Sequence, residues 1–225
     1  MEASAILDEV RTLLDDELEP YLWSDATLML RLNTAVAEVC IRARVIKDST
    51  SAVTSIALVA GTAVYAVDPA VFMVGRARVA GERNMLTLTN AKWMDANRPG
   101  WDDATWAESG TPEFAVFDLA DHTLRVHPIP ADAGTLSMTV WRQPLESEKV
   151  ESDTDEPAIP ANWHGELKHH ILFECYSDMD SEKRNPERAA QHYALFEQRV
   201  GRRPSAHELQ IMSTMRNTKI RAHYD

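Results

Sequence analysis

Near the start of the chain, apolar residues recur at intervals of three and four, the spacing that places side chains on one face of an α-helix. The pattern predicts a helix over residues 3 to 18, which stops before Pro20. It predicts a second, longer helix from Ser24, a residue type that caps helix N-termini well, to about Lys47. Each helix has one apolar face, so we expect both to pack against other helices.

Between residues 51 and 144 the pattern changes to short β-branched runs, which glycine, proline, asparagine and aspartate separate. These runs predict a small antiparallel β-sandwich or barrel. One connection, residues 97 to 112, is long and polar, and we expect its aromatic residues to be exposed. Long connections of this kind commonly contact a partner. The candidate residues for a contact with a neighbouring subunit or a nozzle are Trp101, Asp102, Asp103 and Trp106.

The segment from residue 146 to 161 is acidic and contains prolines, which predicts a solvated linker. Helical spacing then returns, with one helix over residues 162 to 180 and another from Pro186 to Gly201. Because helices precede and follow the strands, we expect an α+β protein with a β domain inserted between two halves of one helical bundle. The expected boundaries are 1–48 and 162–203 for the halves of the bundle, 49–145 for the β domain, 146–161 for the linker and 204–225 for an extended C-terminal helical arm.

The composition narrows the possible functions. The chain has 225 residues and a formal net charge of −12, which disfavours general binding to nucleic acid or anionic membranes because both require clustered cations. The charge is uneven, since residues 181–225 carry nine lysine or arginine residues against five acids. No leader-like segment and no apolar run of about 18 residues is present, so we expect a soluble protein made in a cytoplasm.

Histidines cluster in one predicted helix, at His164, His169 and His170. At about 100° per residue they point to three faces of the helix and cannot bind one metal ion together. We therefore expect polar residues at the edges of a packed helix. Cys40 and Cys175 lie in apolar helical patterns, which predicts buried free thiols. Phosphate-loop, dinucleotide and serine-nucleophile motifs are absent, and we assign no catalytic residue, metal ligand or cofactor and expect no enzyme activity.

Several stretches follow one another in a distinctive order. The long helix is YLWSDATLMLRLNTAVAEVCIRARVIKDS, and a strand pair follows in LVAGTAVYAVDPAVFMVGRARVAG. A Gly-x-Pro strand, a hairpin and a Pro-x-Pro turn occur in GTPEFAVFDLADHTLRVHPIPADAGTLSMTVWRQP, before IPANWHGEL and AAQHYALFEQRVGRRPSA. In order and spacing, over about residues 20 to 205, the chain resembles the head-to-tail adaptor (connector) proteins of short-tailed bacteriophages, of the tail-tubular-protein-A type.

The resemblance implies a structural virion protein at the head–tail junction, made in the cytoplasm of the host bacterium. It implies a homo-oligomer, a dodecameric ring, that joins the portal protein of the head to the nozzle protein of the tail and lines the DNA channel. DNA would pass through without specific binding, since an acidic wall offers its phosphates no cation. No cofactor and no membrane contact are implied.

The resemblance also gives the C-terminal arm a role, because adaptors of this kind insert their C-terminal segment between portal subunits. Basic residues of the arm would face an acidic portal surface, and apolar residues would fill its pockets. The expected portal-binding residues are Arg202, Arg203, Leu209, Met212, Met215, Arg216, Lys219 and Arg221. A frayed terminus without a partner is the alternative.

Two functions of other classes remain open. A β-sandwich module of a virion that binds carbohydrate or protein would carry Trp93, Trp101 or Trp106 on an exposed platform, and burial of these tryptophans would argue against it. A metal-dependent hydrolase would need a tightly bound ion.

Overall fold

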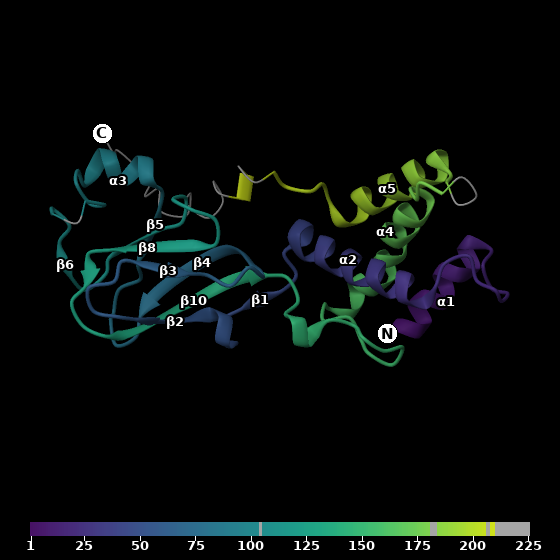
Figure 1. The fold of residues 1–225 in the computed structure, drawn as a ribbon, viewed down its shortest axis with the longest axis horizontal. Helices are drawn as coiled ribbons and strands as arrows, with labels where there is room; N and C mark the ends of the chain where they lie inside the picture. The colour runs from purple at the N-terminus through teal and green to yellow at the C-terminus, as the bar shows by residue number, and fades with distance from the viewer. Residues whose placement is uncertain (104, 181–183, 206–207, 210–225) are drawn as a thin grey trace, which may run out of the picture. The chain divides into compact units, whose positions relative to one another are not determined.

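The computed structural model describes residues 1–103, 105–180, 184–205 and 208–209. They divide into two compact units, which are described separately (Figure 1). The helical unit comprises residues 1–46 and 143–204, and the β unit comprises residues 47–142 with the described residues from Ser205 onward. The chain is an α+β protein, as the pattern predicted.

The helical unit is built around one central helix. Its α-helices are α1 (Ala3–Leu14), α2 (Asp25–Ala43), α4 (His164–Tyr176) and α5 (Pro186–Val200). Helix α4 packs against the other three, and its Leu167, Ile171 and Leu172 are fully buried. The first and last parts of the sequence therefore share one hydrophobic core.

The ends of these helices follow from local sequence. The side chains of Ser24 and Asn185 each accept a hydrogen bond from the backbone N–H three residues later, at 3.2 and 3.1 Å, and so cap α2 and α5. Helix α1 ends at Leu14 and not at the predicted residue 18, because Asp15 adopts the left-handed conformation with φ 56°. Arg44 ends α2 in the same way, with φ 52°.

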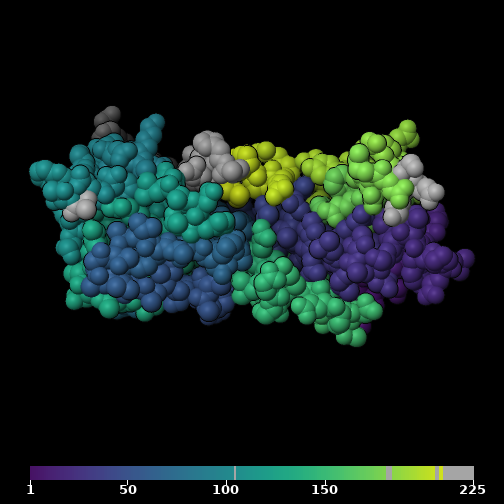
Figure 2. All heavy atoms as spheres, in the orientation of Figure 1, coloured from purple at the N-terminus to yellow at the C-terminus, as the bar shows by residue number. Residues whose placement is uncertain are grey.

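Most of residues 146–161 are exposed, as we expected of a solvated segment, but parts of the segment pack onto the helical unit. Val150 and Ile159 are buried. Asn33 of α2 donates through Nδ2 to the carbonyl of Val150 at 2.8 Å and accepts from its N–H through Oδ1 at 2.9 Å. Two short 3₁₀ turns, Glu146–Glu148 and Ala161–Trp163, lie at the ends of the segment. In the space-filling view this green segment lies against the purple residues of the first two helices (Figure 2).

The same segment completes the start of α1. The N–H groups of Ala3 and Ser4 donate to the carbonyls of Asp155 and Asp153, at 2.8 and 2.9 Å. The first N–H groups of a helix have no partner within it, so these bonds satisfy donors that would otherwise need water. Acidic composition alone does not show such backbone contacts.

The β unit contains two four-stranded sheets and one two-stranded sheet. In the first, β10 (Gly134–Arg142) pairs along one edge with β1 (Lys47–Asp48) and β2 (Ser55–Leu58) and along the other with β4 (Val71–Val79). The second has the order β3 (Val64–Ala66), β8 (Thr123–His127), β7 (Phe114–Val116) and β5 (Thr87–Thr89). The third consists of β6 (Ser109–Gly110) and β9 (Ile129–Pro130), and a 3₁₀ turn, Ala52–Thr54, precedes β2.

The two larger sheets share a core. Leu124 and Val126 of β8 and Leu136 and Val140 of β10 are fully buried in one cluster, which is the packing of a sandwich. Among the described strands no sheet closes into a barrel, and the pairs β5–β7 and β6–β9 are parallel. The expectation of purely antiparallel pairing was therefore wrong at these two pairs.

The connection after β5 contains a helix that the sequence pattern did not predict. Helix α3 spans Ala91–Asn97, and the side chain of Asn90 caps it by accepting the N–H of Trp93 at 2.8 Å. Only Met94 of this helix is buried, so its seven residues show no repeating apolar face. Across both units, none of the described helices has the length and apolar character needed to span a bilayer.

Candidate interaction surfaces

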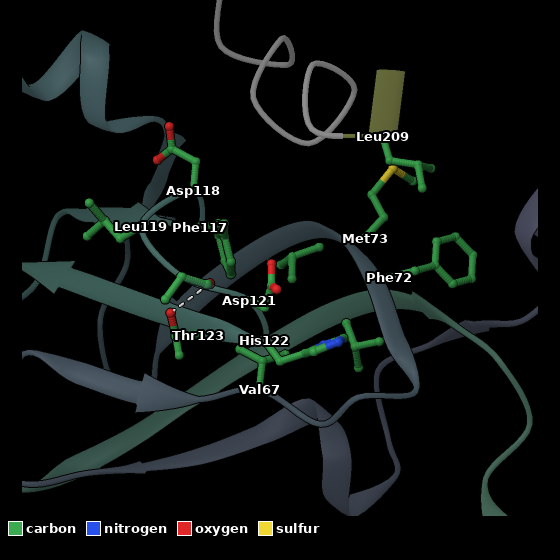
Figure 3. A pocket seen from close by; sticks show the side chains of 13 residues that line it. Val67, Phe72, Met73, Phe117, Asp118, Leu119, Asp121, His122, Thr123 and Leu209 are labelled. Atoms are coloured by element: carbon green, nitrogen blue, oxygen red, sulfur yellow. Dashed lines mark hydrogen bonds between the residues drawn. The ribbon is translucent and has the colours of Figure 1, made fainter. Parts of the chain in front are cut away.

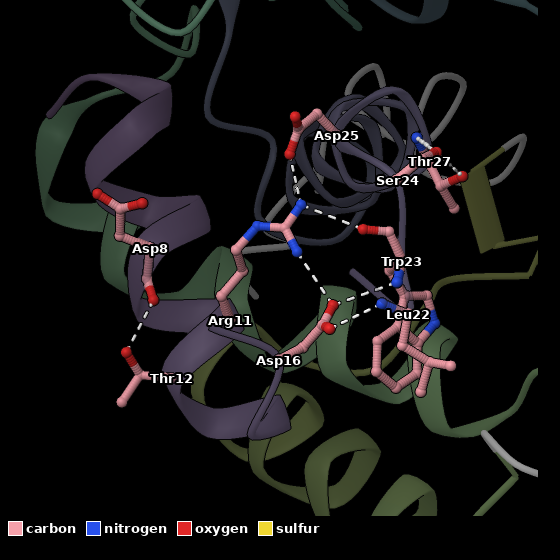
Figure 4. Close-up of polar contacts among 9 residues, drawn as sticks. All are labelled: Asp8, Arg11, Thr12, Asp16, Leu22, Trp23, Ser24, Asp25 and Thr27. Atoms are coloured by element: carbon pink, nitrogen blue, oxygen red, sulfur yellow. Dashed lines mark hydrogen bonds and ion pairs between the residues drawn. The ribbon is translucent and has the colours of Figure 1, made fainter. Parts of the chain in front are cut away.

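A buried ion pair fixes the connection between α1 and α2 (Figure 4). Arg11 Nη1 donates to Asp16 Oδ2 at 3.0 Å. The carboxylate of Asp16 also accepts the N–H groups of Leu22 and Trp23, at 2.7 and 3.2 Å. Arg11 further donates to the carbonyl of Trp23 at 3.1 Å and pairs with Asp25. These bonds hold the backbone between the two helices in one conformation.

This ordered connection exposes apolar side chains. Leu18 is 84% exposed, and Tyr21 and Leu22 are also exposed. The guanidinium of Arg11 lies 3.8 Å from the centre of the Tyr21 ring, which fixes the direction of that ring. Apolar side chains exposed on an ordered loop are typical of a contact surface. Sequence reasoning missed this surface because it extended the buried stripe of α1 to Leu18.

The structure separates the two tryptophans of the long polar connection. Trp101 is 2% exposed, packs in a small core with Met94 and Phe114, and donates from Nε1 to Asp95 Oδ1 at 2.9 Å. The expectation that Trp101 is exposed was wrong, and its side chain is not available to a partner. Trp106 is 74% exposed and is available.

The two aspartates of this connection are exposed. Asp103 accepts the N–H of Thr105 through Oδ1 at 2.7 Å, and this hydrogen bond holds the pKa of Asp103 below its usual value. The carbonyl of Asp102 accepts from Arg125 Nη2 at 2.9 Å. These two hydrogen bonds shape the loop that carries Trp106.

The three histidines of α4 are buried, and our expectation that they lie at the edges of the helix was wrong. Helices α1, α2 and α5 surround α4, so side chains on three of its faces are all internal. His164 Nε2 lies 2.9 Å from the carbonyl oxygen of Ile159, and His169 Nδ1 lies 3.3 Å from Nδ1 of His192 on α5. Burial lowers the pKa of His170 to about 4.

In the part of the chain that the structure describes, no group of three or more His, Cys, Asp or Glu side chains is arranged to hold an ion. Cys40 and Cys175 are buried free thiols, which confirms the prediction for both. Burial raises the pKa of the Cys175 thiol to about 11, so this sulfur is protonated at neutral pH.

Arg202 and Arg203, two of the expected portal-binding residues, follow α5 in the helical unit and are exposed. Arg203 Nη1 pairs with Glu38 Oε1 of α2 at 3.2 Å. The other oxygen of Glu38 accepts from Arg42 Nε at 3.0 Å, and Arg42 donates to the carbonyl of Gly201 at 3.1 Å. Glu38 therefore anchors the exit from α5, and Arg203 already has an acidic partner within the chain.

Ser205 belongs to the β unit, and the described residues Glu208 and Leu209 are helical. The N–H of Glu208 donates to Ser205 Oγ at 3.2 Å, and the N–H of Ser205 donates to Glu208 Oε2 at 2.8 Å, which together form a capping box. Leu209, the third expected portal-binding residue, lines a groove of about 630 Å³ in this unit (Figure 3). The remaining ones, Met212, Met215, Arg216, Lys219 and Arg221, lie outside the described residues.

Two helical segments of one bundle, an inserted sandwich and loops that expose apolar side chains fit a protein that works through contacts. A model of the SU10 adaptor protein family matches residues 1–219. The chain belongs to this family. The resemblance to phage head-to-tail adaptors is thereby confirmed, and the adaptor is a structural component of a virion. No curated protein matches the chain.

Membership in this family bears on the two alternative functions, an enzyme and a carbohydrate-binding module. A structural adaptor family argues against an enzyme, and it implies contact with portal and tail components of the virus. The burial of Trp101 removes one of three residues from the platform that a carbohydrate-binding module would need.

Proposed function

We propose that the adaptor forms a dodecameric ring at the head–tail junction, where it joins the portal protein to the nozzle protein and lines the DNA channel. The observation that carries the proposal is the family match over residues 1–219. A closed ring requires two different surfaces on each copy, because every copy contacts its neighbours head to tail. Such surfaces must be ordered before assembly if they are to bind without a large loss of entropy.

Two exposed surfaces of the described residues have this property. The α1–α2 connection exposes Leu18 above the Arg11–Asp16 ion pair, and the β unit exposes Trp106 on a loop that Asp103 shapes. They lie in different units and differ in chemistry, and a heterologous contact requires two different surfaces. We assign them to contacts with the neighbouring subunit or the nozzle.

The negative net charge supports a channel wall that does not bind DNA tightly. With a net charge of −12, the adaptor offers few phosphate contacts, and DNA can slide past it. No specific DNA binding is proposed.

The C-terminal segment is the proposed portal contact. After Leu209 it carries Arg216, Lys219 and Arg221, which would meet acidic portal surface, while Met212 and Met215 would fill apolar pockets. Arg202 and Arg203 are both exposed at the start of this region, and Arg203 would have to exchange Glu38 for a portal carboxylate.

The test mixes the adaptor with the portal protein of the same virus and images the complex by electron microscopy, with native mass spectrometry to count copies. A ring of adaptor subunits on the portal supports the proposal, and a monomer with no affinity for the portal contradicts it. The double variant R216E and R221E should bind at least about tenfold more weakly, with a smaller salt dependence. Its matched control is R76E with R83E, two exposed arginines of the β unit, which changes the net charge equally.

A further inference from the structure

The groove of the β unit lies between strand β4 and the connection from β7 to β8 (Figure 3). Its floor is apolar and includes Val71, Met73 and Phe117. Its rim is acidic, with Asp118 and Asp121. A concave apolar surface with an acidic rim suits an amphipathic helix that carries basic residues.

One residue of such a helix is already in place. Leu209 lines the groove, and Figure 3 shows its side chain next to that of Met73. Leu209 directly follows Glu208 of the capping box, and its N–H donates to the carbonyl of Ser205 at 3.1 Å. The side chain of Leu209 thus enters the groove from the same chain.

The sequence that follows has the matching chemistry. Met212 and Met215 come three and six residues after Leu209, and Arg216 and Lys219 add positive charge beyond them. Methionine side chains adapt to irregular apolar surfaces, and the basic residues complement Asp118 and Asp121. A single short helix of this composition is marginal in water, so it needs a surface to bind.

We propose that this groove is a docking site for the chain's own C-terminal segment, residues 208–216, in the free adaptor. A segment of the same chain is favoured over a second copy, because the Ser205 cap tethers it at an effective concentration of about 1 mM or more. The proposal does not depend on the ring. Where the segment also binds the portal, which rests on the function proposed above, the two positions exclude each other and the portal must displace it from the groove.

The experiment uses the full chain with a nitroxide spin label on the variant Ala120→Cys, at the exposed rim of the groove. The native thiols of Cys40 and Cys175 are buried and do not compete for the label. Methionine methyl groups are enriched in ¹³C and observed by NMR. Met73 lines the groove and must lose intensity, which verifies the label. Docking predicts that Met212 and Met215 also lose most of their intensity.

Matched variants separate docking from chance proximity. L209D should restore the Met212 and Met215 signals and leave Met73 broadened, whereas Q210D, which adds the same charge beside it, should not restore them. Full Met212 and Met215 intensity beside a broadened Met73 overturns the proposal. Broadening of these signals in enriched, unlabelled chains mixed with labelled, unenriched chains assigns the segment to a second copy and also overturns it. None of these measurements involves the portal, so their failure is distinct from failure of the proposed function.

Discussion

Asp48 and Arg142 are 94 positions apart in the sequence and form a buried ion pair, with Arg142 Nε 2.6 Å from Asp48 Oδ2. Asp48 ends β1 and Arg142 ends β10, so the pair joins the second and last residues of the inserted segment, which runs from Lys47 to Arg142. The carboxylate of Asp48 also accepts the N–H groups of Thr50 and Ser51, at 2.9 and 3.1 Å. The side chain of Asp48 thus connects the start of the inserted segment to its end.

The variant D48N should destabilise the adaptor by about 3 kcal/mol, because it removes the negative charge that pairs with the buried guanidinium of Arg142. Urea unfolding at pH 7 measures the change. D68N is the matched control, since the carboxylate of Asp68 accepts the N–H of Ala70 at 2.8 Å in a turn, and its replacement should cost about 1 kcal/mol or less. Equal losses of unfolding free energy in the two variants would show that the Asp48–Arg142 ion pair stabilises the adaptor no more than the turn hydrogen bond of Asp68.

The direction in which pH changes the stability difference between wild type and D48N follows from the pKa of Asp48. Burial alone would raise the pKa of Asp48, but hydrogen bonds from Ser51, Thr50 and Arg142 hold it well below its ordinary value of 3.8. A carboxyl with a lowered folded pKa stabilises the protein above pH 3.8, and this contribution is lost as the pH falls further. The difference in unfolding free energy between wild type and D48N should therefore be constant from about pH 7 to 5 and shrink below about pH 4.

Gly75 occupies a position where a side chain does not fit. It lies at a β-bulge, where Val74 pairs with Val140 and Arg76 pairs with Thr139. A Cβ atom at residue 75 would lie 2.4 Å from Cζ3 of Trp141. G75A should destabilise by about 1 to 3 kcal/mol through this clash.

The control for Gly75 is G134A, because a Cβ atom there meets only Val79 Cγ1, at an ordinary 3.8 Å. Chemical denaturation compares the two. In a W141L background the cost of G75A should fall, since the two residues contact each other. An undiminished cost in that background would place the strain in the backbone and not in the Trp141 ring.

Periodicity and caps were sufficient to predict the helices that build the bundle. Ser24 and the three- and four-residue spacing located α2, because capping and apolar stripes are local properties of the sequence. The same spacing predicted that the three α4 histidines point to three faces of the helix. It did not predict which residues pack against each face. Whether His170 meets solvent or Phe196 of α5 depends on three helices packing around α4, which is not a local property.

The candidate surfaces were predicted less well for the same reason. Trp101 and Trp106 have similar sequence surroundings, and only the placement of α3 makes one a core residue and the other exposed. Leu18 fits the stripe of α1, and only the left-handed Asp15 ends the helix before it. Val150 lies in a run of acids, yet Asn33 holds its backbone from 117 positions away.

His170 should make the adaptor sensitive to mild acid. It is buried against Phe196 and Phe173, near Glu174 and Glu38 and the cations Arg42 and Arg203, and burial lowers its pKa from 6.5 to about 4. The unfolded chain therefore binds a proton between pH 6.5 and about 4 that the folded chain does not, and stability falls as the pH drops through this range.

The expected loss from His170 is about 3 kcal/mol between pH 7 and 4. Urea unfolding at several pH values should show a shallower decline for H170Q than for wild type. H122Q is the control, because His122 is exposed and its replacement should leave the slope unchanged. Parallel slopes for H170Q and wild type would mean that His170 takes up its proton without unfolding.

Asn33 should control access to the acidic segment. Its amide bonds both backbone groups of Val150, so N33A releases the chain between the two 3₁₀ turns. A protease specific for glutamate should cleave after Glu151 and Glu156 several-fold faster in N33A than in wild type, followed by mass spectrometry of the fragments. T34A is the control, because Thr34 bonds only the carbonyl of Leu30 within its own helix, at 3.0 Å. Equal rates in both variants would mean that burial of Val150 alone protects the segment.

Substitution of Trp101 should lower the stability of the adaptor, whereas substitution of Trp106 should affect its contacts. W101A removes a buried ring that donates to Asp95 and should cost about 3 to 5 kcal/mol of stability. W106S changes a ring that is 74% exposed and should alter stability by no more than about 0.5 kcal/mol. If Trp106 is a contact with a neighbouring subunit or the nozzle, W106S should nevertheless reduce the yield of rings on the portal or their binding of the nozzle, as counted by native mass spectrometry. Normal assembly and normal nozzle binding by a stable W106S variant would remove this loop from the contact surfaces and leave the α1–α2 connection, with Leu18, as the candidate to test next.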